Sequence, residues 1–392
     1  MRFLLLACLG LTGFALPVHA WEFDAKSEGK THVYYRDIGG RGVSAYAQSV
    51  VNFTSLNTRL RASTERSYFE FQPEVRFLFG DFGGTTPADA AYLSVRSPDR
   101  AIGLSRQLFL SETAAGEFDV QRLNYTYQYE GLEFSIGRKP FSLGVLRAMP
   151  VWNKFSRPLP VTAGPALIHG VDSLAYRHQI GDWVMENVLV AGPRREEHAL
   201  FLQGIWFAEF AELHGLVARW WDAWVLGFAM AKDVGGATLR TEILGIDVTA
   251  GGPERQLQWG LGGEYALNEN WSLLAEVLYQ SRGITQTADY TVALPSRFMS
   301  FRGRWYSLLQ AQYKANALWT LSLGILTNCT DFSHYLSPKA QYAINQKADF
   351  FVEANLPVGG HLTEYSARSI SATNGLYYGA PTQITAGLNF AF

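Results

Sequence analysis

Repeated alternation of apolar and polar residues is the feature that most constrains this chain. The stretch QLQWGLGGEYALNENWSLLAEVLYQ, residues 256–280, holds two such runs on either side of a turn at 268–270. Every second residue of each run is apolar, which predicts a β-strand with one apolar face. The pattern recurs at 69–79, 122–129, 303–313, 319–327 and 348–356. Such a chain is expected to form antiparallel sheet, as a soluble exported β protein or as a barrel in lipid.

Two further features favour the barrel in lipid. Aromatic residues recur at strand ends, as at Trp259, Trp271 and Trp305, where membrane barrels carry interfacial girdles. The connections alternate between short turns, such as NEN and NQK, and long loops, as periplasmic turns and external loops do. No segment after the first twenty residues offers the ~20 uninterrupted apolar residues of a transmembrane helix.

We therefore predict an all-β fold, a transmembrane antiparallel β-barrel of about 18 strands with a long inward-folded loop. The alternative is about 16 strands, because alternation weakens over residues 183–249. A barrel this wide is expected to contain a channel. The predicted strands are 30–37, 48–62, 67–79, 119–129, 131–139, 171–179, 183–192, 198–209, 212–221, 224–234, 238–249, 256–267, 271–281, 303–314, 318–328, 333–344, 347–357 and 382–392.

The first twenty residues resemble a secretory signal peptide. An apolar stretch from Phe3 to Leu16 follows Arg2, and small residues precede Trp21. The alternative is an N-terminal membrane anchor. Cleavage would leave residues 21–392 as the barrel and Cys329 as the single cysteine, which excludes an intramolecular disulfide. The expected location is the outer membrane of a Gram-negative bacterium, in contact with its lipids and lipopolysaccharide.

The last nine residues, ITAGLNFAF, alternate and end on Phe392. We expect this strand to close the barrel onto the first strand, because an open sheet edge is not tolerated in lipid. The stretch also resembles the C-terminal signal of bacterial outer-membrane proteins. That resemblance implies recognition by the barrel-assembly machinery through Phe392.

Residues 137–170 form a basic segment without a single acid, rich in glycine and proline. We predict that its part 140–170 folds into the barrel and constricts the pore, because its apolar residues need a packing surface and cationic rings favour anions. The alternative is an external loop whose basic residues meet lipopolysaccharide phosphates. The candidate pore-constriction residues are Arg138, Lys139, Arg147, Lys154 and Arg157.

Other charges alternate onto the face that we assign to the lumen. They are mixed in sign, and we expect most of them to pair across the wall. Arg122 and Glu133, on neighbouring predicted strands, are one expected pair. The lumen-facing candidates are Arg122, Glu133, Arg177, Glu264, Glu276 and Arg304.

The edges of the basic segment resemble the alginate-export family of outer-membrane porins. The matching residues are Ile136-Gly137-Arg138-Lys139, then Trp152, then Gly170-Val171-Asp172. The resemblance implies a passive channel for an anionic exopolysaccharide or for small anionic solutes. A polymer exporter of this kind works with periplasmic export partners.

The sequence gives little indication of other function classes. The net charge of -2 provides no general attraction to nucleic acid. There is no HExxH or GxSxG motif and no metal-ligand spacing among the histidines. We therefore expect neither an enzyme nor a cofactor or metal. The alternative function is a closed outer-membrane barrel with an enzymatic or adhesive role in external loops 80–118, 282–302 and 358–381.

Overall fold

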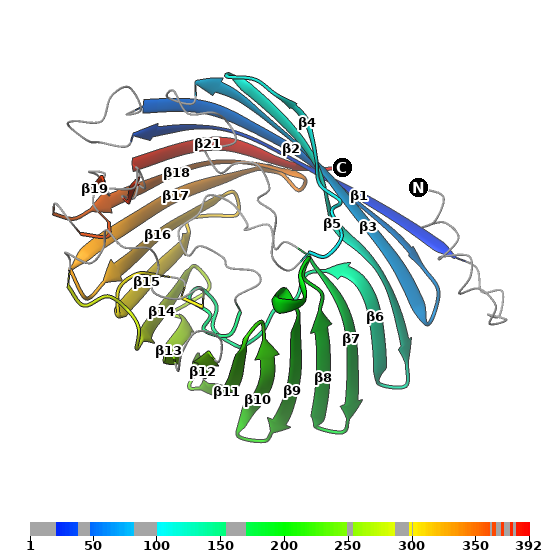
Figure 1. Cartoon of the computed structure of the whole chain (residues 1–392). Coiled ribbons are helices and arrows are strands. Elements are labelled where there is room, and N and C mark those ends of the chain that lie inside the picture. Colours follow the sequence, from blue (N-terminus) through cyan, green and yellow to red (C-terminus); the bar gives the residue numbers. More distant parts are fainter. Residues whose placement is uncertain are drawn as a thin grey trace.

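Eighteen strands close into one antiparallel barrel in which neighbours along the chain are neighbours in the sheet (Figure 1). The computed structural model describes residues 21–37, 48–81, 100–153, 170–248, 254–286, 298–299, 301–360, 363–365, 370–371, 377–378 and 382–392. The predicted all-β barrel is confirmed, and the alternative of 16 strands is wrong. The predicted signal peptide, residues 1–20, lies outside the described residues.

The strand bounds agree with the predicted ranges to within a few residues, except that β1 begins eight residues earlier than predicted and β5 five residues earlier. The barrel strands are β1 (Glu22–Asp37), β2 (Gln48–Ser63), β3 (Ser67–Asp81), β5 (Ala114–Tyr129), β6 (Leu132–Lys139), β7 (Val171–Ile180), β8 (Trp183–Val190), β9 (Ala199–Ala208), β10 (Ala211–Trp220), β11 (Ala223–Val234), β12 (Ala237–Val248), β13 (Glu254–Ala266), β14 (Trp271–Gln280), β15 (Trp305–Lys314), β16 (Trp319–Asn328), β17 (Ser333–Asn345), β18 (Ala348–Val358) and β21 (Thr382–Ala391).

Three short strands and one short helix were not predicted. The strand β4 (Arg106–Leu110) pairs with the first part of β5, beyond the end of β6. The strands β19 (Ile370–Ser371) and β20 (Tyr377–Tyr378) pair with each other, and η2 (Arg195–Glu197) is a 3-10 helix between β8 and β9. Among the described residues, no helix is long and apolar enough to cross a membrane.

The barrel is closed by β21, which pairs with β18 on one side and with β1 on the other. The backbones of Ser27 and Phe392 also exchange two hydrogen bonds, of 3.1 and 3.0 Å. Every edge of the final strand is therefore paired, as a strand in lipid requires. The predicted closure of the last strand onto the first is confirmed.

The outer face of the barrel is apolar and carries two aromatic girdles. Trp271 stacks on Tyr313 at 4.6 Å near the short turns. At the opposite ends of the same two strands, Tyr279 lies 4.7 Å from Trp305. Leu261, between these two levels on β13, is nearly half exposed. These features are those of a transmembrane barrel of the bacterial outer-membrane type.

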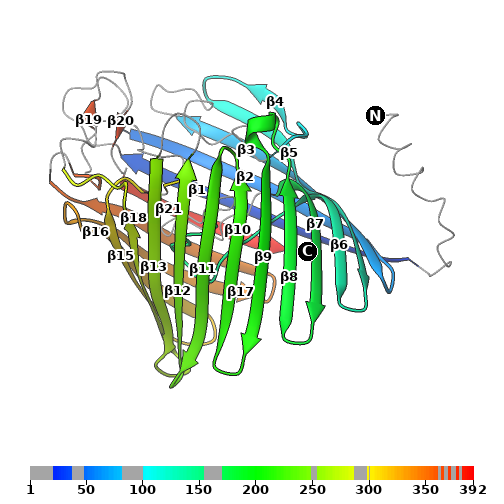
Figure 2. The same ribbon diagram turned by 60° about the horizontal axis from the view of Figure 1, so that its bottom comes forward.

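The two ends of the barrel differ in their connections. Short turns join the strands at the end where Glu22 and Phe392 lie, and β4, β19 and β20 lie at the other end (Figure 2). We call these ends periplasmic and external, by the usual arrangement of such barrels. A cluster of buried apolar residues lies inside the barrel, against the inner faces of β7 to β12 and β14 to β16. The lumen is therefore filled on one side.

Candidate functional site: a constriction inside the barrel

The described part of the basic segment, Pro140–Asn153, runs inside the barrel, and we call it the inward loop. Its apolar side chains are buried against the inner wall, where the ring of Phe141 lies 5.9 Å from that of Phe201 on β9. Trp152 is completely buried, and its indole Nε1 donates to the carbonyl of Ile243 on β12 at 3.0 Å. The buried apolar residues of the loop are Phe141, Leu143, Leu146, Met149, Val151 and Trp152.

Two buried glutamates of the wall hold the backbone of the inward loop. Glu242 on β12 accepts hydrogen bonds from four backbone N–H groups, of Val145, Leu146, Val151 and Trp152, at 2.5–3.0 Å. Glu276 on β14 accepts from three more, of Arg147, Ala148 and Met149, at 2.6–3.2 Å. A short loop leaves its backbone donors without partners, and the two carboxylates supply them. The loop is therefore fixed to the wall.

Glycines in the wall provide the space for this loop. A Cβ added to Gly260 on β13 would lie 2.4 Å from a methyl carbon of Leu146, and one added to Gly227 on β11 would lie 2.7 Å from the Trp152 ring. In register, Glu242 lies between Ala229 and Gly260, so its neighbours on both adjacent strands are small. Small residues on the inner face therefore form the bed on which the loop lies.

Of the predicted constriction residues that the structure describes, Arg147 presents its charge most openly to the lumen. Its side chain is 63% exposed and lies 3.6 Å from Glu264 on β13. Glu264 also contacts Arg240 on β12 at 3.3 Å. The side chain of Lys139 is largely buried at the start of the loop and lies 3.7 Å from Glu133. Lys154 and Arg157 lie outside the described residues.

The prediction that Arg138 contributes a pore charge needs correction. Its side chain is 1% exposed, and it forms a two-pronged ion pair with Asp172 on β7, at 2.7 and 3.1 Å. It also donates to the carbonyls of Val120 and Ile102. Gly137, immediately before Arg138, has a φ of +119° and brings its backbone against that of Leu123 on β5. Arg138 therefore joins β5, β6 and β7 rather than lining a filter.

The opposite side of the lumen is lined by ion pairs, and we call it the charged wall (Arg59, Glu70, Glu74, Arg76, Asp119 and Arg122). Glu70 on β3 is 4% exposed and lies between two arginines, at 3.0 Å from Arg59 and 2.9 Å from Arg122. Those arginines are 40% and 31% exposed. The expected pair of Arg122 with Glu133 does not form, because Arg122 pairs instead with Glu70, which lies opposite Arg61 and Asn124 in register.

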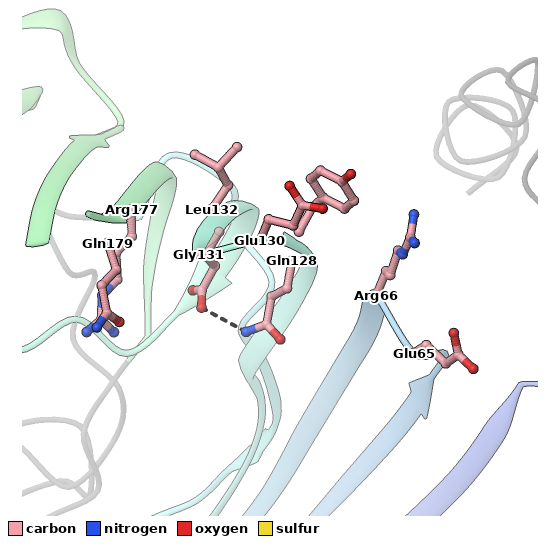
Figure 3. A pocket seen from close by; sticks show the side chains of 10 residues that line it. Glu65, Arg66, Gln128, Glu130, Gly131, Leu132, Arg177 and Gln179 are labelled. Carbon is pink, nitrogen blue, oxygen red and sulfur yellow. Dashed lines mark hydrogen bonds between the residues drawn. The ribbon is translucent and has the colours of Figure 1, made fainter. Parts of the chain in front are cut away.

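The remaining lumen-facing candidates have different roles. Glu133 accepts a hydrogen bond from Gln128 at 3.0 Å, and Arg177 lies opposite it in register on β7. Both line a cavity of about 490 Å³ at the periplasmic end, between the turns β2–β3 and β5–β6 (Figure 3). Glu276 holds the inward loop rather than pairing with a cation. Arg304 lies just before β15, half-buried, and its backbone N–H donates to Thr330 at 3.1 Å.

A second cavity, of about 510 Å³, lies beside the inward loop toward the periplasmic end. Arg147 and Val145 of the loop border it, together with Glu212 on β10 and Lys232 on β11. The loop therefore lies against the wall with open space beside it. Among the described residues, no group of acidic, histidine or cysteine side chains could hold a metal ion.

Glu242 is the residue that the sequence patterns did not single out. It lies in the weakly alternating region 183–249, among apolar and small residues, and the sequence there indicates no partner for its carboxylate. The available signal was the absence of a cation beside it in register, since Ala229 and Gly260 flank it. An inward acid without a cation opposite it on the adjacent strands needs other donors, and here they are the backbone groups of the loop.

Solved structures with a similar fold are outer-membrane porins, whereas no family model and no curated protein matches the chain. OccAB1 of Acinetobacter baumannii matches with a TM-score of 0.58 and 10% identity over 94% of this chain and 96% of that one. A BenF-like porin from Pseudomonas fluorescens matches with a TM-score of 0.57 and 8% identity over 95% and 98%. The chain has the fold of an 18-stranded porin.

OpdK of Pseudomonas aeruginosa, solved with vanillate, is a third match, with a TM-score of 0.54 and 9% identity over 94% of this chain and 98% of that one. These neighbours support a resemblance to porins in general, and they give no support to the alginate-export family in particular. The residues that carried the alginate-export resemblance have structural contacts instead. Gly170 packs on Arg138, Asp172 pairs with it, and Trp152 anchors the loop.

Proposed function

We propose that the protein is an outer-membrane channel through which small solutes pass passively, with a preference for anions. The carrying observation is that three lumen cations, Arg59, Arg122 and Arg147, are more exposed than the acids with which they pair. Arg59 and Arg122 expose their side chains while the carboxylate between them is buried. Glu242 and Glu276 are buried under the loop, and Arg147 on the same loop is exposed. Exposed cations in a narrow lumen raise the local concentration of anions.

Small anions fit the lumen better than an anionic polysaccharide does. The inward loop is bound to the wall through two carboxylates and an apolar cluster, so it occupies part of the cross-section permanently. An extended polymer needs a wide and continuous passage, whereas a small solute needs only the space beside the loop. OpdK, one of the structural neighbours, was solved with vanillate, a small carboxylate.

The test is the reversal potential of the refolded protein in a planar bilayer under a salt gradient. We expect open channels with anion preference, and a clear loss of that preference in the double variant Arg147→Glu, Lys139→Glu. Arg195→Glu, in the external helix η2, is the control and should keep the parental value. A cation-selective parent, or a double variant with unchanged selectivity, contradicts the proposal. A barrel that never conducts supports the alternative role in the external loops.

A further inference from the structure

A buried carboxylate at the external end joins three connections of the barrel. Glu364, in the connection after β18, accepts hydrogen bonds from the Tyr306 hydroxyl and from the amide of Asn328 on β16, the latter at 2.8 Å. The backbone N–H of Arg302, just before β15, donates to its other oxygen at 3.2 Å. One side chain thus contacts the start of β15 and the end of β16.

The backbone on either side of this carboxylate is bound to the turn between β16 and β17. The N–H of Glu364 donates to Asp331 at 2.8 Å, and the N–H of Tyr365 donates to the Ser333 hydroxyl at 3.1 Å. The Tyr365 ring is buried and lies 5.6 Å from that of Tyr335. Tyr365 and Tyr306 belong to the same interior apolar cluster as the inward loop. Residues Thr363–Tyr365 are therefore docked on the barrel interior, and we call them the docked segment.

The surroundings of Glu364 favour its neutral form. Burial raises the pKa of this carboxyl to about 7, and the nearby charge of Asp331 raises it as well. The hydrogen bonds from Tyr306 and Arg302, and the Arg302 charge, act in the opposite direction and are outweighed. Tyr365, Asp331, Arg302 and Tyr306 are the titratable or charged groups that face this carboxyl from the packed elements.

We propose that Glu364 makes the docking of residues 363–365 sensitive to acid. Protonation of Glu364 strengthens their docking on the external ends of β15 to β17, and its ionisation weakens that docking. In the docked state an ionised carboxyl would be buried beside Asp331 and an apolar cluster, and its hydrogen bonds from Tyr306, Asn328 and Arg302 replace only part of the water it loses. In the released state water would solvate that charge. Acid therefore stabilises the docked segment, and neutral to alkaline medium favours its release.

The sign follows from linkage between protonation and docking. The docked pKa is raised from 4.5 to about 7, so docking is strongest below pH 4.5 and weakens as pH rises to about 7. A difference of this size changes the docking equilibrium by at most about 300-fold over that interval. This inference goes beyond the proposed function, because docking is measured without any reference to conduction.

The experiment is a pH titration of segment mobility in the full chain, refolded in detergent or lipid. A nitroxide label is placed at Gly360→Cys in a Cys329→Ser background, since a side chain at Gly360 meets no atom within 4 Å. Its spectrum reports the mobility of the neighbouring docked segment. Glu364→Gln keeps the shape of the side chain and cannot ionise. Glu196→Gln, in the external helix η2, removes an exposed carboxyl and is the matched control.

We expect an immobilised label at pH 4 that becomes mobile as the pH rises, with the transition between pH 4.5 and about 7. Glu364→Gln should remain immobilised at every pH, and Glu196→Gln should titrate like the parent. A parent label with no pH response overturns the proposal, and so does a transition that persists in Glu364→Gln. The parental titration decides the matter even if Glu364→Gln fails to refold.

Discussion

The two sides of the lumen use the same residue type, glutamate, for opposite purposes. On the loop-bearing side, Glu242 and Glu276 bind backbone N–H groups of the inward loop. On the charged wall, Glu70 and Glu74 bind arginine side chains. Both sets are buried. The difference lies in the register neighbours, since Glu242 faces alanine and glycine across the sheet whereas Glu70 faces Arg61 and Asn124.

This comparison shows how one barrel pattern supports two kinds of interior. Outward residues are apolar on both sides, because both face lipid. Inward residues are free to be small on one side, where a loop must fit, and charged on the other, where the wall meets water. The constriction therefore results from an asymmetric interior inside a regular exterior.

The largest expected effect comes from removing both loop anchors in the double variant Glu242→Ala, Glu276→Ala. Each backbone donor that remains buried without its acceptor costs about 1–3 kcal/mol, so we expect the loop to leave the wall. Single-channel conductance in planar bilayers should rise several-fold. Glu264→Ala is the control, because the described ion pairs of that carboxylate are with the side chains of Arg147 and Arg240, whereas Glu242 and Glu276 bind the loop backbone. A double variant with parental conductance would show that other contacts hold the loop.

A second change tests whether the ion pair of Arg138 with Asp172 contributes stability separately from selectivity. Arg138→Ala leaves Asp172 buried without its guanidinium, which should cost about 3–5 kcal/mol. Unfolding in guanidinium chloride, followed by tryptophan fluorescence, measures that loss. Lys26→Ala removes an exposed ion pair with Asp24 and should change stability by less than about 1 kcal/mol. If Arg138→Ala also abolished anion preference, the assignment of Arg138 to structure alone would fail.

The smallest expected effect comes from filling the bed of the inward loop. Gly260→Val places carbon where Leu146 and Val151 now lie, at 2.4 and 3.0 Å from the added Cβ. Overpacking of this kind costs about 1–3 kcal/mol, and limited proteolysis should cut the loop faster than in the parent. Gly215→Val, on β10, meets no atom within 4 Å and is the control. Equal cleavage rates in both variants would argue against a tightly packed bed.

The strand layout was predictable because the period of two is a local property of each strand. Trp319, Leu321 and Leu323 alternate in sequence and share the lipid face in the structure, each about two-fifths exposed. The weakly alternating region 183–249 also forms strands, and it is weak because its inner face is apolar as well. Phe201 and Leu244 face the inward loop there. The ambiguity between 16 and 18 strands thus came from the loop-bearing wall itself.

The partners of the site residues were less predictable. Arg138, Lys139 and Arg147 look equivalent in sequence, since all three are cations in one acid-free segment. Their neighbours come from β7, from a position earlier on β6, and from β13. The partners of Arg138 and Arg147 are distant along the chain and leave no local trace in the sequence. In the structure Arg138 is buried, Lys139 is largely buried and Arg147 is exposed.

The sequence by itself determined the barrel, its lipid-facing residues and the presence of an unusual basic segment, because alternation and composition are read residue by residue. The tertiary structure decided which charges reach the lumen. A charge is exposed or neutralised according to the groups that the closed sheet brings beside it, and closure joins residues from distant strands. For that reason Glu242, which no sequence pattern singled out, binds the loop. Arg138, which the sequence pattern did single out, instead joins strands of the wall.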